Sequence, residues 1–333
     1  MSQSENLSAI PLTIIGGFLG AGKTTLLNRI LNGDHGLRLA VLVNDFGSVN
    51  IDTHLLGNQG DIDLVDLPNG CICCTLARGL VNAVGQVVEA VPPPDHIIIE
   101  ASGVSSPDVV ESLLDVPELS DQIKIDSIVT LADAANVRKL AGAFMFAENQ
   151  IASADIVIIN KVDLVDEAEL AAVTAWITEA APDARVIKTE YAQLPLNLIM
   201  NAGSQETRAY LPHSETHDHA HDHGQIFQSW TFTTGALLSE ECVRTVVANL
   251  PRSIYRAKGI LNLDTDPSRR FVLQVVGKRL SLEVDRERGR QEPATQLVFI
   301  GDRGTFDPDE LETNLKRCLI TQGRAGQDGT TRV

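Results

Sequence analysis

The sequence predicts an α/β protein with a doubly wound, mostly parallel sheet, followed by a smaller α+β domain. Short apolar runs alternate with longer amphipathic segments through the first 200 residues, as βαβ units require. A polar, histidine-rich segment interrupts this pattern, and the run after it alternates like a half-buried strand. We therefore expect a first domain at residues 9–202, a flexible linker at 203–225, a second domain at 226–321 and a disordered tail at 322–333.

Each expected element follows from its local pattern. Continuous apolar runs predict buried parallel strands at 12–17, 39–44, 96–100, 125–133 and 154–160. Amphipathic spacing predicts helices at 23–32 and 167–181. In the second domain we expect a helix at 238–250 and strands at 226–234, 254–263, 269–277, 279–284 and 295–301.

Composition and charge exclude several classes of function. The 333 residues carry a net charge of −17 and only 4% aromatic residues, so nucleic acid is not an expected partner. No apolar run approaches the roughly 20 residues of a membrane helix, and no basic region precedes the first apolar run. Three of the five cysteines fall within four positions, unlike a secreted disulfide framework. We expect a cytoplasmic protein without a membrane partner.

A phosphate-binding loop is predicted between the first strand and the first helix. Gly17, Gly22, Lys23 and Thr24 match G-x-x-x-x-G-K-[ST], with the strand before the motif and the helix after it. Backbone amides and the helix N-terminus would bind phosphate oxygens. Lys23 would bind the outer phosphates, and the Thr24 hydroxyl would bind Mg²⁺. The alternative is a glycine-rich turn matched by chance, which the flanking strand and helix disfavour. The same loop also contains Gly20, Ala21 and Thr25.

An N-K-x-D sequence predicts which base is bound. Asn160, Lys161 and Asp163 follow the strand at 154–160 directly. In P-loop GTPases this motif recognises guanine, because a carboxylate accepts from the ring N–H and the exocyclic amine. Adenine would leave that carboxylate unpaired. The motif favours GTP over ATP, although it can also be a strand end with a turn.

Acidic residues at two further strand ends are expected near the γ-phosphate. Glu100 ends the strand at 96–100 and would order the magnesium shell or the attacking water, with Gly103 nearby. Asp45 follows the strand at 39–44 and falls on a loop near the phosphates. The alternatives are a solvated strand-end acid for Glu100 and a turn-forming residue for Asp45. We expect Lys23, Glu100 and Asp45 to be the catalytic residues.

A cysteine cluster predicts a site for a soft metal. Cys71, Cys73 and Cys74 form C-x-C-C, and thiolates suit Zn²⁺ or Cu(I). Three thiolates leave a tetrahedral zinc one ligand short, which suits transfer of the metal. A buried thiol cluster or a Cys71–Cys74 disulfide are the alternatives. Cys242 and Cys318 fall in helical patterns and are expected in the core.

The linker adds a second group of metal ligands. Alternating histidine and acidic residues on a flexible segment predict metal capture of low specificity, and an expression tag would instead be terminal and contiguous. These ligands are His217, His219, His221 and His223, with His213 close by. His35, His54 and His96 are isolated and are expected to be ordinary surface or packing residues.

Taken together, these motifs resemble the CobW family of metal-linked P-loop GTPases, relatives of the urease and hydrogenase nickel-insertion GTPases. The resemblance rests on GGFLGAGKTTLLN, VNDFG, NGCICC, EASG and NKVD in that order, with the histidine-rich linker and YRAKGIL. It implies GTP hydrolysis, zinc or cobalt binding at the C-x-C-C, and delivery of metal to a client protein. Ser48 stands where family members often carry Glu, and Val43 where some carry an acid, so those carboxylates are missing here.

The order of the motifs suggests how the two sites communicate. Cys71–Cys74 lies in sequence between Asp45 and Glu100, whose loops should respond to the γ-phosphate. We expect GTP to tighten the thiolate geometry and hydrolysis to loosen it. The alternatives are a metal-responsive GTPase that activates a partner without carrying metal, and a small-molecule kinase. For the C-terminal domain we expect client docking or homodimer formation.

Overall fold

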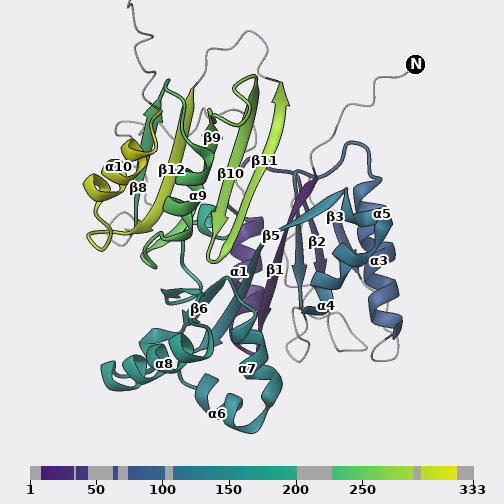
Figure 1. The fold of residues 1–333 in the computed structure, drawn as a ribbon. Helices are drawn as coiled ribbons and strands as arrows, with labels where there is room; N and C mark the ends of the chain where they lie inside the picture. The colour runs from purple at the N-terminus through teal and green to yellow at the C-terminus, as the bar shows by residue number, and fades with distance from the viewer. Residues whose placement is uncertain are drawn as a thin grey trace, which may run out of the picture. The chain divides into compact units, whose positions relative to one another are not determined.

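The computed structural model describes residues 9–33, 35–43, 63–66, 74–101, 108–200, 227–287 and 294–320. The chain divides into two compact units, whose helices and strands are labelled in Figure 1. The first comprises residues up to Phe227 with Val276–Arg279, and the second comprises Gln228–Val275 and the residues from Leu280 onward. No helix within the described ranges has the length and apolar character that crossing a membrane requires.

The first unit contains the predicted parallel sheet. Its described strands lie in the order β3-β2-β4-β1-β5-β6-β7, so β1 is at the centre and every pair with a described register is parallel. The expected α/β class is therefore confirmed. The strand bounds are β1 (Ile10–Gly17), β2 (Leu39–Val43), β3 (Asp63–Asp66), β4 (His96–Glu100), β5 (Ile123–Asp133), β6 (Ile156–Asn160) and β7 (Arg185–Lys188).

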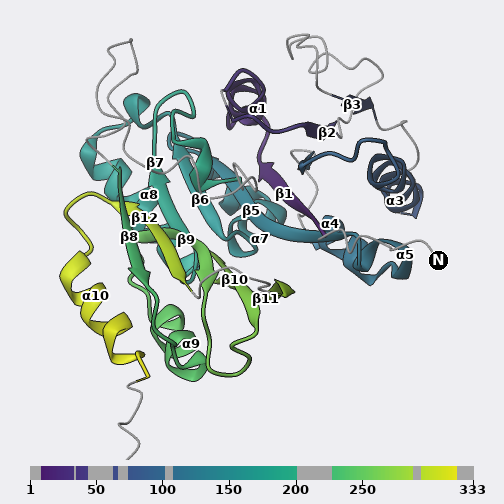
Figure 2. The same cartoon turned by 90° about the horizontal axis from the view of Figure 1, so that it is seen from above.

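Helices cover both faces of this sheet (Figures 1 and 2). One face carries α3 packed on β1, β2 and β4, and α6 to α8 packed on β5 and β6. The opposite face carries α1. The helices are α1 (Lys23–Leu31), α3 (Cys74–Val88), α4 (Asp108–Glu111), α5 (Pro117–Ser120), α6 (Val137–Ala143), α7 (Met145–Ala152) and α8 (Glu167–Ala180), with 3₁₀ turns η1 (Ser112–Asp115), η2 (Val162–Leu164) and η3 (Leu196–Leu198).

The central strands are held by side chains that are buried on both faces. Ile14 pairs in register with Ile99 on β4 and Ile128 on β5, and all three side chains are fully buried. Each such side chain stabilises the fold by about 1.5–3 kcal/mol relative to exposure. Because the strands are parallel, the carboxyl ends of β1, β4, β5 and β6 meet at one edge. Open α/β sheets bind ligands at this edge.

The described part of the second unit is a sheet with two helices packed on it. Its described strands lie in the order β11-β10-β9-β12-β8, and β12 runs antiparallel to β9. Ser239 caps α9 by accepting from the Cys242 N–H, and Asp307 caps α10 by accepting from the first-turn N–H groups. The bounds are β8 (Phe227–Thr234), α9 (Glu240–Ala248), β9 (Ile254–Leu261), β10 (Arg269–Val276), β11 (Arg279–Glu287), β12 (Thr295–Asp302) and α10 (Pro308–Arg317).

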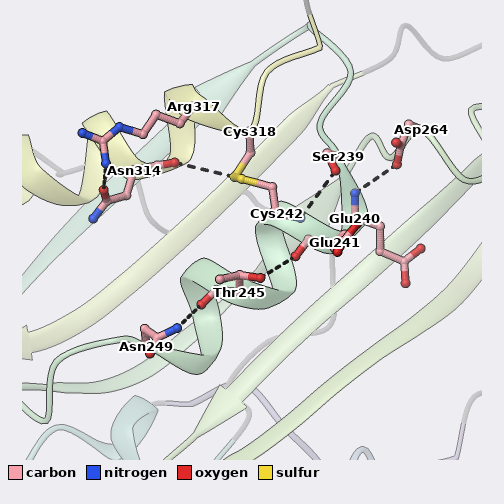
Figure 3. Close-up of a disulfide and its surroundings, with 10 residues drawn as sticks. All are labelled: Ser239, Glu240, Glu241, Cys242, Thr245, Asn249, Asp264, Asn314, Arg317 and Cys318. Atoms are coloured by element: carbon pink, nitrogen blue, oxygen red, sulfur yellow. Dashed lines mark hydrogen bonds between the residues drawn. A yellow bond between two sulfur atoms is a disulfide. The ribbon is translucent and has the colours of Figure 1, made fainter.

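A disulfide joins α9 to the end of α10 (Figure 3). It connects Cys242 on α9 to Cys318 at the end of α10, across a Cα–Cα distance of 5.3 Å. Cys318 is 1% exposed and Cys242 packs partly buried against the same core, as the sequence predicts. The pairing itself was not predicted, because the two residues are 76 positions apart and become neighbours only when α9 and α10 pack together.

Candidate nucleotide-binding site

The loop between β1 and α1 has a backbone that requires glycine. Gly17 has a φ of 133° and Gly22 a φ of 109°, which side-chain-bearing residues rarely adopt. A Cβ on Gly17 would lie 2.5 Å from the Leu131 carbonyl oxygen of β5. A Cβ on Gly22 would lie 2.4 Å from Asn160 Nδ2. The sequence therefore folds this loop tightly against the neighbouring strands.

Lys23 folds back over the loop that precedes it. Its Nζ donates to the Gly17 carbonyl at 3.0 Å and to the Phe18 carbonyl at 3.4 Å, and the residue is 8% exposed. Gly22 is the N-cap of α1 and provides no side-chain cap, so the first-turn N–H groups are suited to an anion. Thr24 is half-buried in this turn and Thr25 is exposed. The arrangement supplies the donors that a phosphate group needs.

Asn160 connects this loop to the N-K-x-D segment at the end of β6. Its Nδ2 donates to the Ala21 carbonyl at 2.9 Å, and its Oδ1 accepts from the Ala192 N–H at 2.9 Å. The side chain is buried, with 2% exposure of the residue. Because both ends of the amide are bonded, Asn160 holds the glycine-rich loop and the two loops after β6 and β7 in fixed relative positions.

Lys161 and Asp163 follow Asn160 around the edge of the sheet. Lys161 has a φ of 62°, and its Nζ lies 2.9 Å from Asp133 Oδ2 at the end of β5. Partial burial acts to raise the pKa of Asp133. Hydrogen bonds from the Lys161 ammonium, the Asn136 amide and a backbone N–H outweigh it, so this pKa lies below its ordinary value. The Asp133 carboxyl group is therefore ionised at neutral pH. Asp163 lies in η2 with its side chain exposed to solvent.

Two features of this edge were missed by sequence reasoning. Asp133 ends a strand just as Glu100 does, and this strand-end position is the sequence feature that could have identified it as a site residue. The loop after β7 gave no sequence signal, yet Tyr191 and Ala192 have φ values of 50° and 52°. Such values are uncommon outside glycine and often mark functional sites. The Tyr191 carbonyl accepts from Arg29 Nε of α1 at 2.8 Å, which ties this loop to the helix behind the phosphate loop.

The remaining predicted residues are placed only in part. Glu100 ends β4 and is buried, in register with Ile15 on β1 and Val43 on β2. Cys74 is the first residue of α3, and its side chain is not among those described. Within the described residues, no group of three or more His, Cys, Asp or Glu side chains could hold a metal ion. The predicted residues outside the described ranges are Asp45, Gly103, Cys71, Cys73, His217, His219, His221 and His223.

A glycine-rich loop after the central strand of a parallel sheet, bonded to an N-K-x-D segment at the same edge, defines a P-loop GTPase. The CobW/HypB/UreG nucleotide-binding domain model matches residues 11–188, and the cobalamin synthesis protein CobW C-terminal domain model matches residues 227–319. The chain belongs to the CobW/HypB/UreG family of P-loop GTPases. The family that the sequence motifs indicated is thereby confirmed.

Named relatives span most of the chain. A protein of Pseudomonas aeruginosa named zinc chaperone CobW is 31% identical over 95% of this chain and 93% of its own length. The Escherichia coli protein named zinc chaperone YjiA is 29% identical over 89% of this chain and 95% of its own length. A Dictyostelium discoideum protein named zinc-regulated GTPase metalloprotein activator 1 is 32% identical over 58% of this chain and 48% of its own length.

Proposed function

We propose that this GTPase is a metallochaperone that binds zinc through Cys71, Cys73 and Cys74 and couples GTP hydrolysis to transfer of the metal to a client protein. The observation that carries the GTPase half is the Asn160 amide, which bonds the phosphate loop and the base-recognition loops together. The metal half rests on the C-x-C-C chemistry and on the relatives named zinc chaperones. Cobalt or another divalent metal could take the place of zinc at these thiolates.

The described residues fit the chemistry of GTP hydrolysis. Lys23 would exchange its two carbonyl partners for the outer phosphate oxygens, and the backbone N–H groups of Gly20 and Gly22 would face the phosphates. The Asp163 carboxylate, exposed at the same edge, would accept from guanine. The ion pair with Asp133 would hold Lys161 beside the bound guanine. The two hydrogen bonds of the Asn160 amide would hold Asn160 in place.

Magnesium and the attacking water require further oxygen ligands at this edge. The Thr24 hydroxyl is placed in the first turn of α1, where a metal bound to the phosphates could reach it. Glu100 is a buried acid at the end of the adjacent strand and would hold the magnesium shell or orient water, together with Asp45. Mg²⁺ bound there would neutralise charge that develops on the phosphates.

The proposed zinc site is attached to a well-anchored helix. Cys74 begins α3, whose Leu80, Val84 and Val87 are buried against β1, β2 and β4. β4 ends at Glu100, so the helix that carries one thiol shares a core with the strand that carries the proposed γ-phosphate acid. This shared core supports a coupling of nucleotide state to thiolate geometry. The linker histidines would add metal-binding capacity of low specificity.

A client metalloprotein would receive the metal, and the second unit would dock that client or form a homodimer. The acidic net charge of −17 disfavours nucleic acid. We propose a cytoplasmic location, where a nucleotide-driven chaperone would find both GTP and metal-requiring enzymes.

Replacing Cys73 with Ser tests the metal half of the proposal. We expect zinc affinity, measured by competition with a chromophoric chelator, to fall at least tenfold because one of three thiolates is lost. Affinity for a fluorescent GDP analogue should stay within twofold of the unaltered protein. Deleting residues 213–223 is the matched control, and it should lower the number of zinc ions bound while leaving one tight site. Loss of the tight site in that deletion would show that the linker histidines, and not the cysteines, form the tight zinc site.

A regulatory role is the second candidate, favoured by the relative named zinc-regulated GTPase metalloprotein activator 1. In that case metal would control GTP turnover and activate a partner without moving to it. Labelled zinc separates the two, because only a chaperone passes the label to its client during GTP hydrolysis. A small-molecule kinase predicts phosphate transfer without metal dependence, and the guanine-type N-K-x-D segment argues against it.

A further inference from the structure

We infer that Phe144 is a positioning residue for nucleotide binding, which acts on the phosphate loop by stacking on Phe18. The two ring centroids are 5.9 Å apart and the rings are inclined by 23°. Phe18 directly follows Gly17 in the phosphate loop, whereas Phe144 lies more than a hundred positions later in sequence. The inference rests on the GTPase site alone and is independent of the proposed metal chemistry.

Phe144 lies at the junction between two helices, α6 and α7. It lies directly after α6 and directly before α7, with its N–H donating to the Leu140 carbonyl at 2.8 Å and its carbonyl accepting from the Ala147 N–H at 3.0 Å. Helix α7 is attached to the sheet by Thr130 of β5, whose hydroxyl donates to the Gln150 carbonyl at 2.9 Å. Phe144 nevertheless remains 44% exposed, which is more than a core residue would be. Its contact with Phe18 is therefore the feature that needs an explanation.

The backbone of Phe18 controls the geometry of the phosphate loop. Its carbonyl accepts from the Ala21 N–H at 3.1 Å, which closes the turn of the loop. The same carbonyl lies 3.4 Å from Lys23 Nζ. Phosphate binding requires Lys23 to leave the Gly17 and Phe18 carbonyls while the loop keeps its shape. Stacking on Phe144 holds the Phe18 residue in place during that exchange.

Helix α6 also links the two halves of the nucleotide site. It begins after the turn that follows Asp133, the partner of Lys161, and it ends directly before Phe144, the partner of Phe18. A displacement of α6 would therefore reach the base-recognition segment at one end and the phosphate loop at the other. Phe144 therefore supports the phosphate loop through its contact with Phe18.

The test compares Phe144→Ala with Phe144→Tyr, which retains the ring, and with Met145→Ala, the neighbouring residue that is 78% exposed. Binding of fluorescent GDP and GTP analogues and steady-state GTP turnover are measured on the full chain. From the strength of aromatic pairs we expect Phe144→Ala to weaken nucleotide binding by about 3- to 10-fold. Phe144→Tyr and Met145→Ala should bind as the unaltered protein does.

A double-mutant cycle separates positioning from general destabilisation. Phe18→Ala combined with Phe144→Ala should bind nucleotide no more weakly than Phe18→Ala alone, because the stacked partner is already absent. Phe144→Leu, which fills most of the ring volume, replaces Phe144→Ala if the latter fails to fold and should show the same loss. Unchanged binding in the folded Phe144 variants, or fully additive effects in the cycle, would overturn the inference.

Discussion

Gly22→Ala is expected to lower the affinity for GDP and GTP at least a hundredfold. The backbone of Gly22 has a φ of 109°, and its added Cβ would lie 2.4 Å from Asn160 Nδ2. Asn160 cannot move aside without breaking its bonds to the Ala21 carbonyl and the Ala192 N–H. The substitution therefore displaces both the phosphate loop and the base-recognition loops, at a cost of several kcal/mol. Calorimetric titration with both nucleotides measures the loss.

The matched control for this variant is Gly36→Ala. Gly36 also has a positive φ, at 63°, but a Cβ there meets no atom within 4 Å. We expect a decrease of about 1–2 kcal/mol in the free energy of unfolding for the left-handed backbone, with unchanged nucleotide affinity. Equal nucleotide affinity in Gly22→Ala and Gly36→Ala would show that Gly22 does not support the site.

Breaking the Cys242–Cys318 disulfide is expected to give the second large effect, on stability. The two residues are 76 positions apart, and the chain-entropy model gives a stabilisation of about 4.5 kcal/mol for a loop of that length. Chemical denaturation with and without a thiol reductant measures it. We expect the unfolding midpoint of the second unit to fall on reduction while nucleotide affinity stays the same, because the nucleotide site lies in the first unit.

The folded structure should survive this reduction. The Ser239 N–H donates to the Cys318 carbonyl and the Ile320 N–H to the Leu237 carbonyl, both at 2.9 Å, so the segments around the bond stay paired. Cys242→Ser is the control, and its stability should equal that of the reduced protein and show no response to reductant. An unfolding free energy that is identical with and without reductant in the unaltered protein would contradict the expected stabilisation.

Continuous apolar runs made most of the first sheet predictable. The runs that contain Ile14, Val41, Ile98, Val129 and Ile158 are buried on both faces, and each forms a strand close to its expected bounds. The strands β3 and β7 were missed for a physical reason. Each has four residues with charged side chains at both ends and lies at an edge of the sheet, where no continuous apolar run is needed.

The candidate site was predictable where its chemistry is local in sequence. The phosphate loop and the N-K-x-D segment are short motifs, and sequence reasoning found both. The bridge from Asn160 to Ala21, the ion pair from Lys161 to Asp133 and the stacking on Phe18 join segments that only the folded sheet brings together. No local pattern records such contacts, so they could not be predicted.

Reciprocal titration tests most directly whether nucleotide state and thiolate geometry depend on each other. Zinc affinity is measured with and without a nonhydrolysable GTP analogue, and affinity for the analogue with and without zinc. We predict that both affinities rise by the same factor, about fivefold or more. Zinc affinity that does not change with the analogue, together with analogue affinity that does not change with zinc, would contradict it.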